Sequence, residues 1–96
     1  MRTLQIHYKL KTPGGNYRVL EDYLKGFGAW AHVHESLWLV RANKSVGTVR
    51  SELKARMRPG DRVVVFDVTA DSWATNFDDE VTEWMQKHMG TVPLAV

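Results

Sequence analysis

The chain has 96 residues, of which 44% are hydrophobic and 25% charged, so it fits one globular domain with a modest core. It contains no cysteine, which excludes disulfides, thiolate metal sites and a cysteine nucleophile. No apolar run reaches the roughly 18 residues that a membrane span needs, and the first ten residues lack the apolar middle of a signal peptide. We therefore expect a cytoplasmic protein with no membrane partner.

The net charge of +2 is unevenly distributed along the chain. Up to Arg62 there are twelve Lys and Arg residues against five acids, and from Val63 onward there is one Lys against six acids. This asymmetry is typical of a nucleic-acid surface with an acidic appendage. A solvated basic helix followed by a solvated acidic helix explains it equally well.

The first elements follow from periodicity. Residues 3–10 alternate between apolar and polar side chains, which predicts a half-buried strand. The Pro-Gly-Gly run at 13–15 predicts a turn, and Asn16 is a good N-cap for a helix that runs to about Gly26. The apolar stripe of that helix is formed by Leu20, Tyr23, Leu24 and Phe27.

The remaining elements are two strands, a helix, a strand and a last helix. Residues 29–34 and 36–42 are rich in aromatic and β-branched side chains, so they predict a hairpin. Ser45 is expected to cap a helix, and "RVVVFDV" from Arg62 has the composition of a central strand. The last helix carries an apolar stripe formed by Val81, Trp84, Met85 and His88.

The order β-α-β-β-α-β with an added helix predicts an α+β, ferredoxin-like sandwich. Its antiparallel sheet has the strand order 4-1-3-2, with both core helices on one face. We expect a single domain over 1–96, with a core at 1–69, a C-terminal loop and helix at 70–90, and a frayed tail at 91–96.

The second face of this sheet is left bare by the two core helices. Gln5 and His7 are expected on it, with Trp30, His32 and Trp38 beside them. Such an exposed apolar patch marks an interface, and a homodimer is the commonest way to cover it. Coverage by the C-terminal helix is the alternative.

The histidines and some of the acids are candidate metal-binding or catalytic residues. In the 4-1-3-2 order His7 is roughly 10 Å from the strand of His32, too far to share one zinc ion, so no metal site is assigned. Asp67 ends a strand beside the first one and can approach Lys9, in a contact that is as consistent with a structural role as with a functional one.

Phosphate contacts are predicted near the first turn and on the second helix. The Gly14–Gly15 turn precedes a helix N-terminus, with Lys9 and Lys11 nearby, and Arg50 and Lys54 are one helical turn apart. The sequence has neither a nucleotide P-loop nor the aromatic motif of an RNA-recognition domain.

Several stretches together resemble the SinR-like proteins of the CRISPR-associated protein 2 superfamily. They are "HYKL" (7–10), "TPGGNY" (12–17), "GAWAHVHESLWLV" (28–40) and "VVVFDVTADSWA" (63–74). The resemblance implies a ferredoxin-like fold and a homodimer packed through the sheets. It also implies that some relatives are metal-dependent nucleases, which use an Asp after the first-strand Tyr, and that others bind DNA structurally.

Lys9 stands at the position of that Asp in this chain. A lysine cannot ligate magnesium, so no cofactor is expected. The first interpretation is a non-catalytic homodimer that binds nucleic acid or a protein partner. One alternative is an endonuclease that uses displaced acids, such as Asp67 or Asp71, with magnesium. The other alternative is a small-molecule-binding or structural assembly domain.

Overall fold

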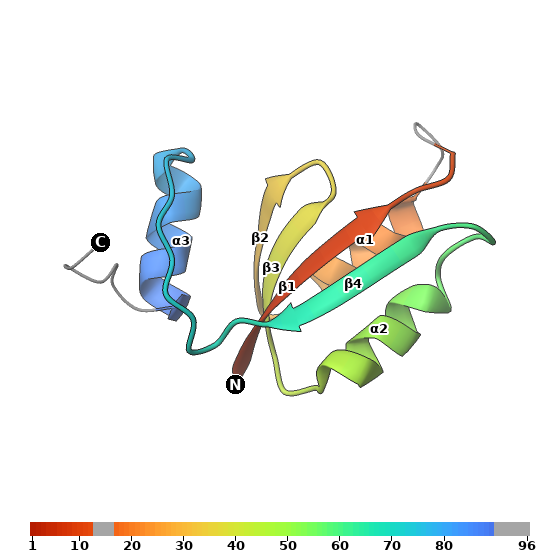
Figure 1. Ribbon diagram of the computed structural model, residues 1–96, viewed down its shortest axis with the longest axis horizontal. Helices are drawn as coiled ribbons and strands as arrows, with labels where there is room; N and C mark the ends of the chain where they lie inside the picture. Colours follow the sequence, from red (N-terminus) through yellow and green to blue (C-terminus); the bar gives the residue numbers. More distant parts are fainter. Residues whose placement is uncertain (13–16, 90–96) are drawn as a thin grey trace.

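A computed structural model describes residues 1–12 and 17–89 of the chain (Figure 1). The elements are β1 (Arg2–Lys9), α1 (Arg18–Lys25), β2 (Ala29–His34), β3 (Leu37–Ala42), α2 (Val46–Lys54), β4 (Arg62–Asp67) and α3 (Asp79–Met89). The predicted elements are therefore confirmed in kind and order. The turn at 13–15, the Asn16 cap and the tail at 91–96 lie outside the described residues.

The four strands form one antiparallel sheet in the order β2-β3-β1-β4, which is 4-1-3-2 when it is listed from the other edge. Both α1 and α2 pack on one face of this sheet, because their apolar stripes share a cluster with alternate residues of β1 and β3. The fully buried members of that cluster are Leu4, Ile6, Leu20, Leu24, Trp38, Val40, Val49 and Leu53. Ser45 caps α2 as predicted, because its hydroxyl accepts a hydrogen bond from the Thr48 backbone N–H at 3.1 Å.

The second face of the sheet is only partly covered. Trp84 and Met85 of α3 pack against Ala31 and Leu39, which belong to β2 and β3. Figure 1 shows α3 at one end of the molecule, apart from α1 and α2. The start of β1 is covered as well, since Thr3 is fully buried and its hydroxyl donates a hydrogen bond to the His88 carbonyl oxygen of α3. The part of this face around Lys9, Arg62, Val64 and Phe66 stays open.

Strand β4 lies at an edge of the sheet, so the central position that its composition suggested is wrong. Its side chains explain the composition in another way. Val63 and Val65 face the helices and are partly buried, whereas Val64 and Phe66 face the open side and are 43% and 51% exposed. An apolar edge strand that is exposed on one face is a site where a partner can bind.

No helix within residues 1–12 and 17–89 is long and apolar enough to cross a membrane.

Candidate functional site

The five residues predicted to share the bare face do not share it. Gln5 and His7 lie on the open side as expected, because they pair with Leu39 and Leu37 of β3. Trp38 pairs with Ile6, however, and is fully buried under α1 and α2. The strand alternation places Trp30 and His32 on that same helix-covered face, since they pair with Val40 and Trp38. The predicted orientation of this hairpin is therefore wrong.

The misplaced residues form an aromatic cluster with a structural role. The rings of His32 and Trp38 are stacked with centroids 4.0 Å apart, and Trp30 contacts the same indole at 5.5 Å. Trp38 Nε1 donates a hydrogen bond to the Tyr8 hydroxyl at 3.1 Å, and that hydroxyl donates to the Glu35 carbonyl oxygen. Burial raises the pKa of Tyr8, so this phenol stays a neutral donor. The cluster fixes the hairpin against β1.

Cations from distant parts of the sequence meet at one end of the molecule. Lys9 ends β1, Arg62 begins β4, and the two residues are directly opposite in the β1–β4 pair. The adjoining loops are joined by Asp61, whose carboxylate accepts hydrogen bonds from the backbone N–H groups of Lys11 at 2.8 Å and Arg58 at 2.9 Å. These bonds hold the pKa of Asp61 below its usual range, and the bond from Lys11 contributes most. The carboxylate is thus used to hold the loops together.

The open side of this end is hollowed. An open hollow of about 400 Å³ is lined by residues that include His7, Lys9, Ser36, Arg62 and Val64. Sequence reasoning identified Lys9 here but not Arg62 or Ser36. Only the strand register shows that Arg62 stands opposite Lys9, and no pattern within either strand reveals it.

The other predicted phosphate contacts lie on a different surface. Arg50 and Lys54 are exposed on α2 and line a shallow hollow with Ser51 and Ala55. Because α2 packs on the helix-covered face and Lys9 faces the open side, the sheet separates the two groups. The four predicted cations therefore do not form one continuous surface.

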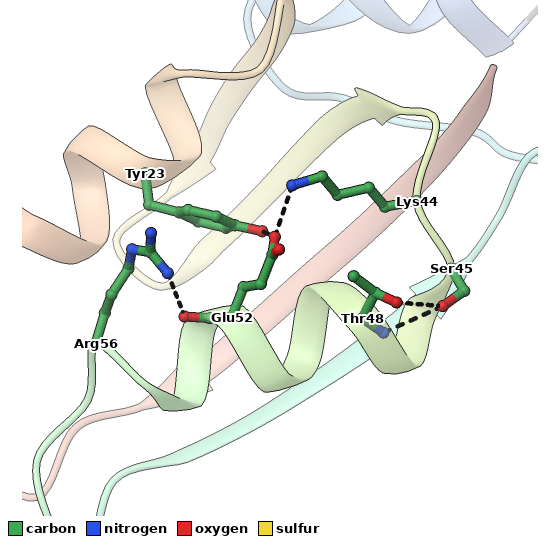
Figure 2. Close-up of polar contacts among 6 residues, drawn as sticks. All are labelled: Tyr23, Lys44, Ser45, Thr48, Glu52 and Arg56. Carbon is green, nitrogen blue, oxygen red and sulfur yellow. Dashed lines mark hydrogen bonds and ion pairs between the residues drawn. The ribbon is translucent and has the colours of Figure 1, made fainter.

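A second polar cluster, which the sequence did not predict, joins α1 to α2 (Figure 2). The Tyr23 hydroxyl donates a hydrogen bond to Glu52 Oε1 at 2.6 Å, and Lys44 Nζ pairs with the same oxygen at 2.7 Å. The Arg56 guanidinium lies 4.3 Å from the centroid of the Tyr23 ring. Burial raises the pKa of Tyr23, and the bond to Glu52 raises it further. The pKa of Glu52 is lowered, first by the hydrogen bond from Lys44 and then by that from Tyr23. The Tyr23–Glu52 hydrogen bond thus links α1 to α2.

The predicted approach of Asp67 to Lys9 is wrong. Asp67 pairs with Leu4, at the opposite end of β1 from Lys9, because β4 runs antiparallel to β1. Its carboxylate instead accepts hydrogen bonds from the Thr69 hydroxyl at 2.6 Å and from Arg2 at 2.5 Å. The Thr69 bond first, and then Arg2, lower the pKa of Asp67 to about 2.

These acids do not fit a magnesium site. The oxygens of Asp67 are engaged by Arg2 and Thr69, and Asp71 lies in the loop after β4, beside a cavity under α3. Within residues 1–12 and 17–89 no group of three His, Asp or Glu side chains is arranged to hold a metal ion. The nuclease hypothesis therefore gains no support from the placement of its proposed acids.

The cavity under α3 has a volume of about 240 Å³ and a mainly apolar lining. Its lining includes Leu39, Val68, Phe77 and Met85. The ring of Trp73 also lines it, and Trp73 Nε1 is buried without a hydrogen-bond partner among the described residues.

On the open side of β1 and β4, exposed charged and exposed apolar side chains adjoin. This surface combines Lys9 and Arg62 at one end with Val64 and Phe66 farther along β4. Comparisons of the chain with protein-family models, with curated proteins and with solved structures found no match.

Proposed function

We propose that this protein binds nucleic acid without cutting it, through phosphate contacts at its basic end. The proposal is carried by one observation, the convergence of Lys9 and Arg62 with the loop cations Lys11 and Arg58. The acids of α3 and its preceding loop lie at the other end of the molecule (Figure 1). A phosphate chain is attracted to the first end and repelled by the second, so the charge separation orients it.

A non-catalytic role is supported by Lys9 and by the contacts of Asp67. Lys9 stands where the resembled family has its metal-binding Asp, and the carboxylate of Asp67 is neutralised by Arg2. The assignment to the SinR-like and CRISPR-associated protein 2 superfamily stays a proposal, as does the ferredoxin-like fold. The strand order and the two helices on one face support that fold.

Binding to labelled DNA at several salt concentrations tests this function. Affinity should fall steeply between about 50 and 200 mM salt, because binding releases counterions from the phosphates. A double variant, Lys9→Gln with Arg62→Gln, should weaken binding and reduce the slope of log K against log salt by about 1.4 for a single strand, or about 0.7 for each lost contact.

The matched control is Arg50→Gln with Lys54→Gln, which removes the same charge from the surface of α2. It should weaken binding less than the first double variant. Equal losses would mean that only the net charge matters and that there is no localised site. Binding that does not respond to salt would contradict the proposed function.

We also propose that the protein is a homodimer, joined at the free edge of β4. The Val68 backbone N–H donates a hydrogen bond to the Thr3 carbonyl oxygen at 2.9 Å. Thr3 and Val68 are therefore a hydrogen-bonded pair of the β1–β4 ladder, in which every second pair along the strands is hydrogen-bonded. Because such pairs alternate, Val63, Val65 and Asp67 direct their backbone N–H and C=O groups away from β1. No proline and no charge interrupts residues 63–66, so a second β4 can pair with this edge about a two-fold axis.

A further inference from the structure

The cations at the basic end form an uncompensated pair. Lys9 and Arg62 are directly opposite on the open face, where like charges destabilise an antiparallel pair. Among residues 1–12 and 17–89 the ion pairs are Arg2–Asp67 and Lys44–Glu52, so neither Lys9 nor Arg62 has an acidic partner there. A bound anion would remove this repulsion.

The hollow around this pair presents donors to such an anion. The Lys9 ammonium and the Arg62 guanidinium carry positive charge, and His7 and Ser36 line the same hollow. Phosphate oxygens accept hydrogen bonds from both cationic groups, and a guanidinium can bind two phosphate oxygens at once. Because the hollow is open along the sheet, a phosphate within a longer chain can occupy it as well as a free phosphate can.

Farther along β4, the same face becomes apolar and aromatic. Val64 and Phe66 follow Arg62 at two-residue spacing, which places Phe66 roughly 13 Å from Arg62 along the strand. The ring of Phe66 is half exposed, and Gln5 lies directly opposite it on β1. An exposed ring beside an amide can stack on a nucleic-acid base while the amide bonds the base edge.

Only an unpaired strand can use both parts of this surface. In a duplex the faces of the bases are stacked on one another and only their edges are accessible in the grooves, so Phe66 would have no base to stack on. We infer that the open face of β1 and β4 binds single-stranded nucleic acid, with a phosphate between Lys9 and Arg62 and a base on Phe66. This inference rests on the proposed function and names its substrate class.

The test compares a labelled single-stranded DNA of about 12 nucleotides with the same sequence as a duplex, by fluorescence anisotropy. The single strand should bind the wild type at least about tenfold more tightly, since stacking on one aromatic ring contributes about that factor. Phe66→Leu should lose this preference for the single strand while its salt slope is unchanged, because the phosphate contacts persist. Thermal unfolding verifies that the variant is folded.

Phe77→Leu is the matched control, because Phe77 is exposed to a similar extent, 47%, but stands in the loop before α3. It should keep the affinity of the wild type. Equal binding of strand and duplex, or unchanged single-strand binding by Phe66→Leu, would overturn this inference and leave the proposed function standing. If neither the single strand nor the duplex bound in a salt-dependent way, both this inference and the proposed function would be overturned.

Discussion

Gly60 shows how a single residue shapes the basic end. Its φ is +93°, in the left-handed region that favours glycine, and it precedes Asp61, which holds the Lys11 and Arg58 loops together. A Cβ at Gly60 would lie 2.5 Å from Lys11 Cδ, although that flexible side chain can move aside. The backbone conformation is therefore the main constraint at this position.

Gly60→Ala should destabilise the protein by about 1–2 kcal/mol, because a side chain in the left-handed region clashes with its own backbone. Urea unfolding monitored by tryptophan fluorescence measures the change. Gly47→Ala is the control, since Gly47 lies in α2 with no atom near the added Cβ. It should stabilise by up to about 1 kcal/mol, and a neutral Gly60→Ala would show that the turn tolerates a side chain.

Asp67 makes stability depend on acid pH. Its pKa is lowered to about 2 from an ordinary value near 3.8, so its ionised form is favoured by folding. The resulting stabilisation is fully present above pH 3.8 and is lost as the pH falls through about 2. We expect Asp67→Asn to lower the urea midpoint at pH 6 but to have little effect near pH 2. An equal loss at both pH values would show that charge is not the cause.

At the scale of elements, α3 is held differently from α1 and α2. Its apolar contacts belong to a cluster with Ala31 and Leu39 that is separate from the core under the other two helices. Its C-terminal turn is fastened by the His88 carbonyl oxygen, which accepts hydrogen bonds from the Thr3 hydroxyl at 3.2 Å and from Arg41 at 3.3 Å. Because the two clusters are separate, we expect that α3 can detach without opening the main core.

Met85→Asp should release α3, because it places a charge among the apolar side chains between the helix and the sheet. Hydrogen exchange should show lost protection in 79–89 and retained protection in β1, β3 and α2. Gln86→Asp adds the same charge at an exposed position and should leave the protection of α3 and of the sheet unchanged. If Met85→Asp lowered protection throughout the sheet, α3 would belong to the same cooperative unit.

At the scale of the whole molecule, the chain is elongated, with axes of 43, 26 and 21 Å, and its charges are separated along it. The acid-rich α3 lies at one end, and the ends of β1 and α2 lie at the other (Figure 1). Pairing of two β4 edges would place the basic ends of the two copies at opposite ends of a shared open face, because the strands run antiparallel.

Sedimentation should give twice the mass of one chain, and Val65→Pro should convert the dimer to a monomer. The Val65 N–H points to the free edge, so proline removes a donor to the partner but none to β1. Circular dichroism should show an unchanged fold. A wild type that sediments as a monomer at high concentration would refute the dimer.

Much of the fold follows from short patterns. The alternation in residues 3–10 predicts β1, and the stripe with Leu20 and Leu24 predicts the buried face of α1. In both cases a single buried face makes apolar residues recur with the period of the element, two residues in a strand and about 3.6 in a helix. The run 37–40 is apolar at every position, so it has no alternation to orient it. Trp38 was misplaced for this reason, and its burial and its bond to Tyr8 decide the orientation.

By itself the sequence determined the elements, their order and the basic character of the first two thirds of the chain, because these depend on local periodicity and composition. Only the tertiary structure decided that Lys9 opposes Arg62, that Asp67 pairs with Arg2, and that Phe66 is exposed beside Gln5. Each of these joins residues more than 50 positions apart, and strand register, which no local pattern encodes, brings them together.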